Sequence, residues 1–356
     1  MKKFLLFFVA ALFTLYSVNA QEQSVTAEQI AALNERIAEL EGKVEAQKSR
    51  SEKWGKIVEK LPKISGIVKM GYTWSDEQDA ETNEFWIQHV RLILSGDISK
   101  KFGYKLQFEF ASPKLVDAYI RWKVNPAFNV QFGQFHVPFS LEGPLSPAKW
   151  ETVESAPVVG AITGLPDTRD MGIDIYGQFL KVKERYLFDY AVGVFQGEGK
   201  NKHDANKSKD VIGRLKFFPI EELCLTGSYS YGERGEDYVV NQRAAAGLEY
   251  KGKAFSLRSE YLWHKQNGAD GAAPVYQDGF YVVAQYKVKN FAPVVRYNFY
   301  NQKSILSQRS DYVVGLNYSP VKLLNFQLNY TLSNIAAAGV DNTSFNSVGF
   351  AAILSF

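Results

Sequence analysis

Cysteine is almost absent from this sequence, since Cys224 is the one cysteine among 356 residues. A single thiol cannot form a disulfide within the chain, so the sequence does not encode a disulfide-stapled secreted scaffold. Long apolar runs are also missing. After residue 20, no stretch reaches the roughly 18 consecutive apolar residues that mark a transmembrane helix, and none is predicted there.

A large excess of charge of either sign is missing as well. The sequence has 41 basic and 38 acidic residues, and two of the basic ones, Lys2 and Lys3, lie in a segment that the mature protein is expected to lose. The remaining charge is close to balanced. This gives no argument for a nucleic-acid partner or for a polybasic tail on a membrane surface.

The histidines form no catalytic or metal-binding motif. The four are His89, His136, His203 and His264, and none stands in a His-x-x-His or Glu-x-x-His spacing or beside a serine in a recognisable motif. We therefore predict no enzyme, no metal site and no cofactor. The histidines are interpreted as hydrogen-bonded residues of the interior or the loops.

The first 20 residues are typical of a secretory signal peptide. Lys2 and Lys3 precede the apolar run Phe4–Leu15, and small residues follow up to Ala20. The mature chain is predicted to begin at Gln21, which is not cysteine, so acylation of the lipoprotein type is not expected. An uncleaved membrane anchor is the alternative, but the apolar run is shorter than the roughly 20 residues of a helical span.

Residues 21–62 are predicted to form a coiled-coil segment. Apolar side chains recur at alternating spacings of three and four residues, which is the heptad pattern of packed helices; they are Ile30, Leu33, Ile37, Leu40 and Val44. The pattern weakens after Val44 and stops at Pro62. A single amphipathic helix docked on the rest of the chain is the alternative.

From Ile64 to the last residue the periodicity changes to two, which predicts β-strands. Sixteen strands are expected, and most have about the ten residues that a tilted strand needs to cross a membrane. They lie near 64–74, 85–98, 102–111, 115–124, 127–137, 169–180, 185–196, 210–218, 223–231, 242–251, 254–264, 279–288, 291–300, 310–318, 323–333 and 346–356. The predicted fold is all-β: a 16-stranded antiparallel transmembrane β-barrel over residues 63–356, preceded by the helical coiled coil.

The connections favour a membrane barrel over a soluble sandwich. The odd-numbered connections are mostly long and polar and the even-numbered ones are tight, as expected when one rim faces the periplasm. One departure is the short connection 111–114. The last strand ends on Phe356 after an alternating apolar face, which resembles the signal read by the outer-membrane barrel-assembly machinery. We therefore expect a location in a bacterial outer membrane, with the coiled coil in the periplasm.

The longest connection, 138–168, is rich in proline and apolar residues. Loops of this length are usually functional or disordered, and this composition favours packing. In a barrel of sixteen strands the open centre is where such a loop can pack, so we predict that it narrows the channel.

Three segments resemble the family of phosphate-selective porins O and P: Arg91–Asp97, Gly133–Phe139 and Arg169–Ile173. The resemblance extends over about residues 25–356, and the segments on either side of the long loop are its most specific part. It implies a trimeric pore that prefers anions and passes phosphate-like solutes along arginines and lysines of the lumen.

The alternation itself supports an anion preference in part. Charge on the lipid-facing side of a barrel strand costs about 2–4 kcal/mol near the midplane, so basic strand residues are expected in the lumen, where arginine can hold an oxyanion with two parallel hydrogen bonds. The predicted lumen residues are Arg91, Lys105, Arg121, Lys123, Arg169, Arg214, Lys216, Arg258 and Arg296. The same faces carry Asp97, Glu109, Asp117, Asp174 and Glu260, so any one of the basic residues could instead pair with a carboxylate and stiffen the wall.

The expected function is therefore an outer-membrane porin for passive diffusion of small hydrophilic solutes, with a preference for anions such as phosphate. The alternative is a structural barrel that tethers the membrane or mediates adhesion through its periplasmic coiled coil. Conductance discriminates between them, because a filled barrel passes no ions. The expected partners are outer-membrane lipid, other copies of the chain, small anions and the barrel-assembly machinery.

Overall fold

The computed structural model describes residues 27–58, 61–77, 80–164, 167–268, 272–339 and 341–356. The predicted signal peptide, residues 1–20, lies outside these residues. The chain divides into two compact units, residues 1–61 and residues 62–356, and each is described by itself.

The first unit contains one described helix, α2 (Ala27–Val58). Its apolar side chains Ile37, Leu40 and Val44 are exposed, with exposed fractions of 47%, 55% and 64%. On the helical wheel these residues form one stripe, because they follow the spacing of three and four. Within the described residues, no helix is long and apolar enough to cross a membrane.

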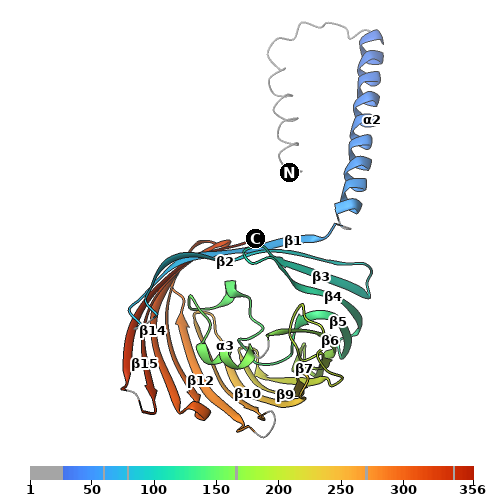
Figure 1. The fold of residues 1–356 in the computed structure, drawn as a ribbon. Helices are drawn as coiled ribbons and strands as arrows, with labels where there is room; N and C mark the ends of the chain where they lie inside the picture. The colour runs from blue at the N-terminus through green and yellow to red at the C-terminus, as the bar shows by residue number, and fades with distance from the viewer. Residues whose placement is uncertain (1–26, 59–60, 78–79, 165–166, 269–271, 340) are drawn as a thin grey trace. The chain divides into compact units, whose positions relative to one another are not determined.

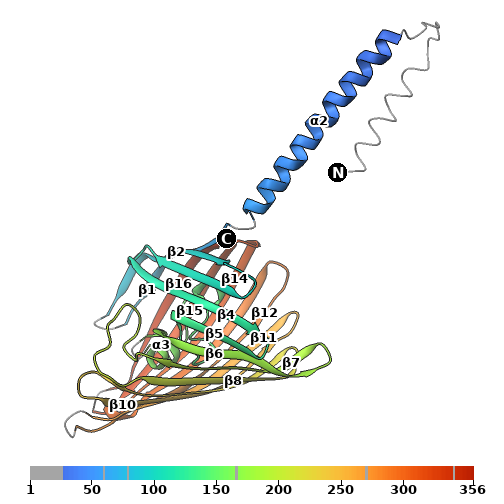
Figure 2. The ribbon, with the colours of Figure 1, turned by 90° about the vertical axis from the view of Figure 1, so that its right-hand side faces the viewer.

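The second unit is a closed barrel of sixteen antiparallel strands, which confirms the predicted strand number and the all-β barrel (Figure 1). Each strand pairs with its neighbours in sequence, and the ring closes where β1 pairs with β16, from Ile67 opposite Ser355 to Ser75 opposite Ser347. Figure 2 shows that the strands forming the wall are tilted. The strands are β1 (Lys63–Ser75), β2 (Thr82–Asp97), β3 (Phe102–Glu109), β4 (Lys114–Asn125), β5 (Phe128–His136), β6 (Arg169–Val182), β7 (Arg185–Phe195), β8 (Asp210–Ile220), β9 (Leu223–Arg234), β10 (Val239–Lys251), β11 (Phe255–Gln266), β12 (Val275–Tyr286), β13 (Phe291–Gln302), β14 (Ser307–Val321), β15 (Leu324–Ala337) and β16 (Thr343–Ser355).

Alternate residues of a strand lie on opposite faces of the barrel wall, as the alternating sequence predicts. On β13 the side chain of Val295 is 55% exposed, whereas its neighbour Arg296 is 8% exposed and Asn298 is fully buried. On β14 Tyr312 and Val314 are exposed and Val313 is buried. Apolar side chains that are exposed in this way form the outer surface, and the polar side chains between them point inward, as expected when a barrel faces lipid.

Short turns lie on one rim of the barrel and most long connections on the other, but the separation is less strict than predicted. The turns after even-numbered strands are 98–101, 126–127, 183–184, 221–222, 252–254, 287–290 and 322–323. On the opposite rim lie the connections 76–81, 137–168, 196–209, 267–274 and 338–342. The connections expected to be long between strands 9 and 10 and between strands 13 and 14 are only 235–238 and 303–306. In both cases the paired strands continue outward, because pairing satisfies backbone hydrogen-bonding groups that a loop would leave to water.

Candidate functional site in the barrel lumen

The connection between β5 and β6, residues 137–168, lies inside the ring of strands (Figure 1). It contains a short 3-10 helix, η1 (Pro147–Lys149), and one short α-helix, α3 (Pro157–Thr163). The side chains of Val158 and Ile162 on α3 are fully buried against the inward apolar residues of β11, β12 and β13. Val153 packs against a different part of the wall, β1 and β16. The connection, called the lumen loop below, therefore contacts two separate parts of the wall.

Arginines of the wall hold the lumen loop by its acidic residues. Arg258 on β11 donates hydrogen bonds to Glu142, with Nη2 to Oε2 at 2.9 Å, and to both oxygens of Glu151, at 2.5 and 3.1 Å. Arg296 on β13 donates to the hydroxyl of Thr152 at 2.6 Å and to the carbonyl of Glu154 at 2.7 Å. These two arginines, predicted as lumen residues, are both buried beneath the loop.

Uncharged side chains on β14 and β15 bind the backbone of the same segment. Asn317 and Gln327 donate to the carbonyls of Glu151 and Trp150, each at 2.8 Å. Asn329 accepts a hydrogen bond from the amide of Val153 at 2.6 Å. Burying an amide side chain is costly unless it is hydrogen-bonded, so these inward amides are matched to the loop backbone. These amides were not predicted as loop contacts from the sequence, although their alternation with apolar residues was the available signal.

Lys69 on β1 is a further contact that the sequence analysis did not identify. Its side chain is fully buried, donates to the carbonyl of Val153 and lies over the ring of Trp150, with Nζ 4.7 Å from the ring centroid. Arginine and lysine favour aromatic faces in this geometry. The lysine thus ties the β1 wall to the part of the loop that β14 and β15 also hold.

The first turn of the lumen loop is fixed by Ser140. Its φ of 68° is in the left-handed region, which a residue other than glycine adopts only when its surroundings hold it there. Glu260 on β11 accepts hydrogen bonds from the Ser140 hydroxyl and the Leu141 amide, each at 2.8 Å. The carbonyl of Ser140 accepts from Arg214 on β8 at 2.9 Å. The turn is therefore clamped by two strands of the wall.

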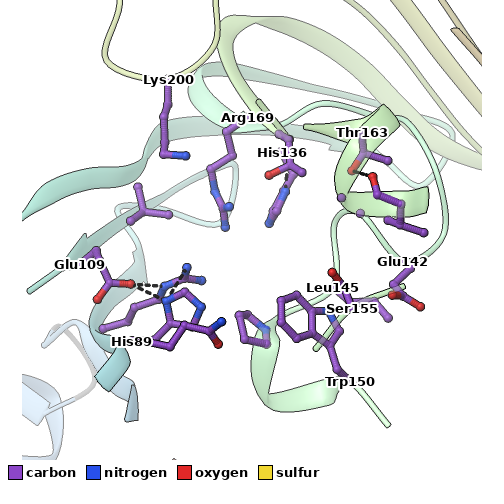
Figure 3. A pocket seen from close by; sticks show the side chains of 18 of the residues that line it. His89, Glu109, His136, Glu142, Leu145, Trp150, Ser155, Thr163, Arg169 and Lys200 are labelled. Carbon is purple, nitrogen blue, oxygen red and sulfur yellow. Dashed lines mark hydrogen bonds and ion pairs between the residues drawn. The ribbon is translucent and has the colours of Figure 1, made fainter. Parts of the chain in front are cut away.

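A cavity of about 340 Å³ opens on the long-connection side of the lumen loop (Figure 3). We call it the loop-side chamber. Its wall carries charged residues and histidines, and its loop face carries Leu145, Pro147 and Trp150. The charged residues and histidines that line it are His89, Arg91, Glu109, Lys114, His136, Glu142, Arg169 and Lys200. Lys200 comes from the connection 196–209, so a second connection reaches the mouth of this chamber.

Most charges of the loop-side chamber are paired. Arg91 donates to Glu109 at 2.9 Å, and Glu109 also lies 2.8 Å from the ring nitrogen of His89. Arg169 donates to Asp117 at 2.7 Å, and Lys200 pairs with Asp167. A cation and its carboxylate largely cancel at a distance, so this chamber offers a solute polar contacts with little net charge.

A second cavity, of about 500 Å³, lies on the side of the short turns. We call it the turn-side chamber. Its basic residues are Arg121 on β4 and Arg214 and Lys216 on β8, and its acidic residues are Asp174 and Asp189. Residues Val137, Pro138 and Pro144 of the lumen loop also line it, and His136 lines both chambers. The first part of the loop therefore separates two adjoining cavities in one lumen.

The nine basic residues predicted for the lumen thus fall into four groups. Arg91 and Arg169 line the loop-side chamber, whereas Arg121, Arg214 and Lys216 line the turn-side chamber. Arg258 and Arg296 lie under the lumen loop. Lys105 pairs with Asp117 at 2.6 Å and Lys123 pairs with Asp97 at 2.7 Å, and in each pair the partner lies on a nearby strand of the wall. For metals, the described residues bring no three histidine, cysteine or acidic side chains together in a group able to hold an ion.

Comparison with solved structures finds porins from several bacteria. The anion-selective porin from Comamonas acidovorans has a TM-score of 0.63 and 14% identity, with 83% of this chain and 99% of that chain covered. OmpF of Salmonella typhi in complex with daunomycin has a TM-score of 0.61 and 14% identity, covering 83% and 97%. The outer membrane channel DcaP of Acinetobacter baumannii gives 0.60 and 12%, also covering 83% and 97%. A search of curated protein sequences gives no match.

The closed 16-strand barrel of this chain therefore has the fold of these porins. The model of the family "Phosphate-selective porin O and P" matches residues 68–233. This stretch runs from β1 through the lumen loop to β9. This match confirms, over that stretch, the resemblance found in the sequence.

Proposed function

We propose that this porin carries small hydrophilic solutes across the outer membrane by passive diffusion, with a preference for anions such as phosphate. The observation that carries the proposal is the pair of adjoining chambers on either side of the lumen loop, each lined by arginine and lysine. Arginines and lysines in a pore compensate an anion for the hydration that it loses. The family description and the anion-selective porin from Comamonas acidovorans support the sign of the preference.

We further propose that the lumen loop, including residues 138–168, is the constriction of the pore. The support is its position between the two chambers and its contacts with both β1 and β11–β13. A solute passing from one chamber to the other moves between this loop and the wall formed by β2–β8. The nine basic residues predicted from the sequence are proposed as pore-wall residues, and two of them, Arg258 and Arg296, act by holding the loop.

The assembly proposed for the mature chain is a homotrimer with residues 1–20 removed and residues 21–62 in the periplasm. A trimer form of OmpT from Vibrio cholerae is among the similar structures. The exposed apolar stripe Ile37, Leu40 and Val44 on α2 supports self-association of this segment as a coiled coil. Surrounding lipid and the barrel-assembly machinery are the other proposed partners.

The test is reconstitution of the purified full chain in a planar lipid bilayer. In a gradient of potassium chloride we expect discrete channel steps and a reversal potential of the sign that chloride selectivity gives. Phosphate added to the bathing solution should reduce the chloride current, because phosphate competes with chloride for the same basic residues. Absence of steps would favour the structural barrel instead, and a cation-selective reversal potential would contradict the anion preference.

A further inference from the structure

The predicted basic residues differ in whether a carboxylate neutralises them. Five of them pair with Asp or Glu in the barrel or lumen loop, and Arg296 is bound to Thr152 and the carbonyl of Glu154. The paired ones are Arg91 with Glu109, Lys105 and Arg169 with Asp117, Lys123 with Asp97, and Arg258 with Glu142 and Glu151. For Arg121, Arg214 and Lys216, the parts of the chain that the structure describes provide no carboxylate oxygen within 4.0 Å.

These three cations line the same cavity, the turn-side chamber of about 500 Å³. Arg121 faces the chamber from β4, and Arg214 and Lys216 face it from adjacent inward positions of β8. The Nε atom of Arg121 is buried and has no hydrogen-bond partner among the described residues. Arg214 donates one hydrogen bond to the carbonyl of Ser140, which fixes its guanidinium beside the first turn of the lumen loop. The three cations therefore share a polar cavity with Asp174 and Asp189, but among the described residues neither carboxylate lies within 4.0 Å of any of them.

The two chambers differ electrostatically for this reason. An ion pair acts on a passing ion as a dipole, whereas an unpaired cation acts with its full charge over several ångströms. Guanidinium groups can also hold an oxyanion with two parallel hydrogen bonds, and a carboxylate partner takes up part of that donor set. The turn-side chamber combines both properties. The basic residues elsewhere in the lumen are more numerous, but they do not combine them.

We propose that the turn-side chamber is the oxyanion-binding site of the pore, and that Arg121, Arg214 and Lys216 set its anion preference. The inference rests on the proposed pore function and makes it more specific. The ligand class is a small oxyanion, for which inorganic phosphate is the probe. The paired basic residues of the loop-side chamber then shape the entrance and contribute little to selectivity.

The experiment compares Arg121→Gln, Arg214→Gln and Lys216→Gln with the unsubstituted full chain in planar bilayers. Each substitution is expected to lower the chloride-to-potassium permeability ratio about tenfold, because one charge about 6 Å from a passing ion in water-like surroundings favours the anion about threefold and disfavours the cation by a similar factor. Block of the chloride current by phosphate should weaken as well. Arg121→Lys and Arg214→Lys keep the charge, so they should retain the permeability ratio but weaken phosphate block, because lysine lacks the planar fork of donors.

Matched controls separate this chamber from the net charge of the lumen. Lys114→Gln removes one cation from the loop-side chamber, where its side chain is exposed, and should shift the ratio less. Replacing Lys123 and Asp97 together by Gln and Asn removes an ion pair on the strand that carries Arg121, and should also shift it less. Asp189→Asn removes an acidic group from the turn-side chamber and should raise the ratio.

The outcomes distinguish the inference from the function on which it rests. Equal shifts for Lys114→Gln and Arg121→Gln would mean that total lumen charge sets selectivity, and would overturn the inference. An unchanged ratio in the three chamber variants would also overturn it while the pore function stands. If the glutamine variants fail to insert, an unchanged ratio in Asp189→Asn is sufficient to reject it. No channel steps from the unsubstituted chain would instead contradict the proposed function.

Discussion

Arg258 shows how one side chain can determine the shape of the lumen. It lies on β11, is 3% exposed, and binds Glu142 and Glu151 at two separate points of the lumen loop. A buried ion pair need not stabilise a protein relative to an apolar core, but removing one partner leaves the other charge buried and uncompensated. The residue therefore acts on the position of the loop rather than on solutes directly.

The Arg258→Gln variant is expected to unfold at a lower temperature, because Glu142 and Glu151 lose their charged partner. The expected loss is about 3 kcal/mol, typical for breaking a buried pair. The temperature at which the folded band is lost on detergent gels measures it. Lys181→Gln is the control, since Lys181 pairs with Glu184 where both side chains are exposed and such pairs contribute little. Equal effects of the two variants would contradict the role of Arg258.

At the residue scale the sequence predicted which side chains face inward, but not their partners. Arg258 and Lys216 occupy the same kind of position in an alternating strand, yet one is bound to two glutamates and the other faces an open chamber. The difference comes from Glu142 and Glu151, which lie on a connection whose path no periodicity encodes. The buried lysine Lys69 was missed for the same reason, since its partners are Val153 and Trp150 on that connection.

The lumen loop is the element whose placement distinguishes a narrow pore from a wide one. Its buried residues Val158 and Ile162 fill the space beside β11–β13, and its backbone is bound by the amides of β14 and β15. Those hydrogen bonds satisfy loop groups that would otherwise be buried without partners. The loop thus has a fixed position with the two chambers on either side.

Replacing residues 143–164 by a short glycine-serine linker is expected to raise the single-channel conductance, because the two chambers would merge into one wider opening. Single-channel recording in planar bilayers measures the change. Lys149→Gln, an exposed substitution on the same loop, is the control and should leave the conductance closer to that of the full chain. A deletion variant that inserts and conducts as before would show that the loop does not limit the current.

Elements of the wall were predictable because the membrane imposes a strict rule on them. Each strand needs one apolar face and enough residues to cross, so sixteen strands appear directly in the alternation. Their ends were less predictable. β9 ends at Arg234 and β10 begins at Val239, whereas the expected strands were 223–231 and 242–251. Outside the hydrocarbon layer the alternation that marks a strand is no longer required.

For the whole molecule, two units with different periodicities lie in one chain. The helical unit, taken by itself, carries an exposed apolar stripe, with Val44 64% exposed. Burying such side chains between helices contributes about 1.5–3 kcal/mol each, so association through α2 would stabilise an oligomer of the barrel. A seam of isoleucine, valine and leucine does not by itself specify three helices, and the proposed trimer rests on the related porins.

Removing residues 21–62 is therefore expected to leave barrel insertion intact and to weaken the oligomer. Gels run without heating detect both, because folded barrels and oligomers migrate differently from the unfolded chain. Ile37→Asn in the intact chain should reproduce the loss of oligomer, whereas Glu45→Gln, off the apolar stripe, should not. If the oligomer is equally stable without this segment, the barrel alone is responsible for assembly.

The sequence by itself indicated the fold class of this protein, because lipid demands strands of alternating polarity and spanning length, and both demands are local to a strand. Tertiary structure alone decided which lumen charges remain unpaired. Arg258 and Glu142 are separated by 116 positions, and Arg121 lacks a carboxylate partner only because of where β6, β8 and the lumen loop lie around it. Electrostatic pairing depends on distances between side chains far apart in the chain, and periodicity carries no information about those distances.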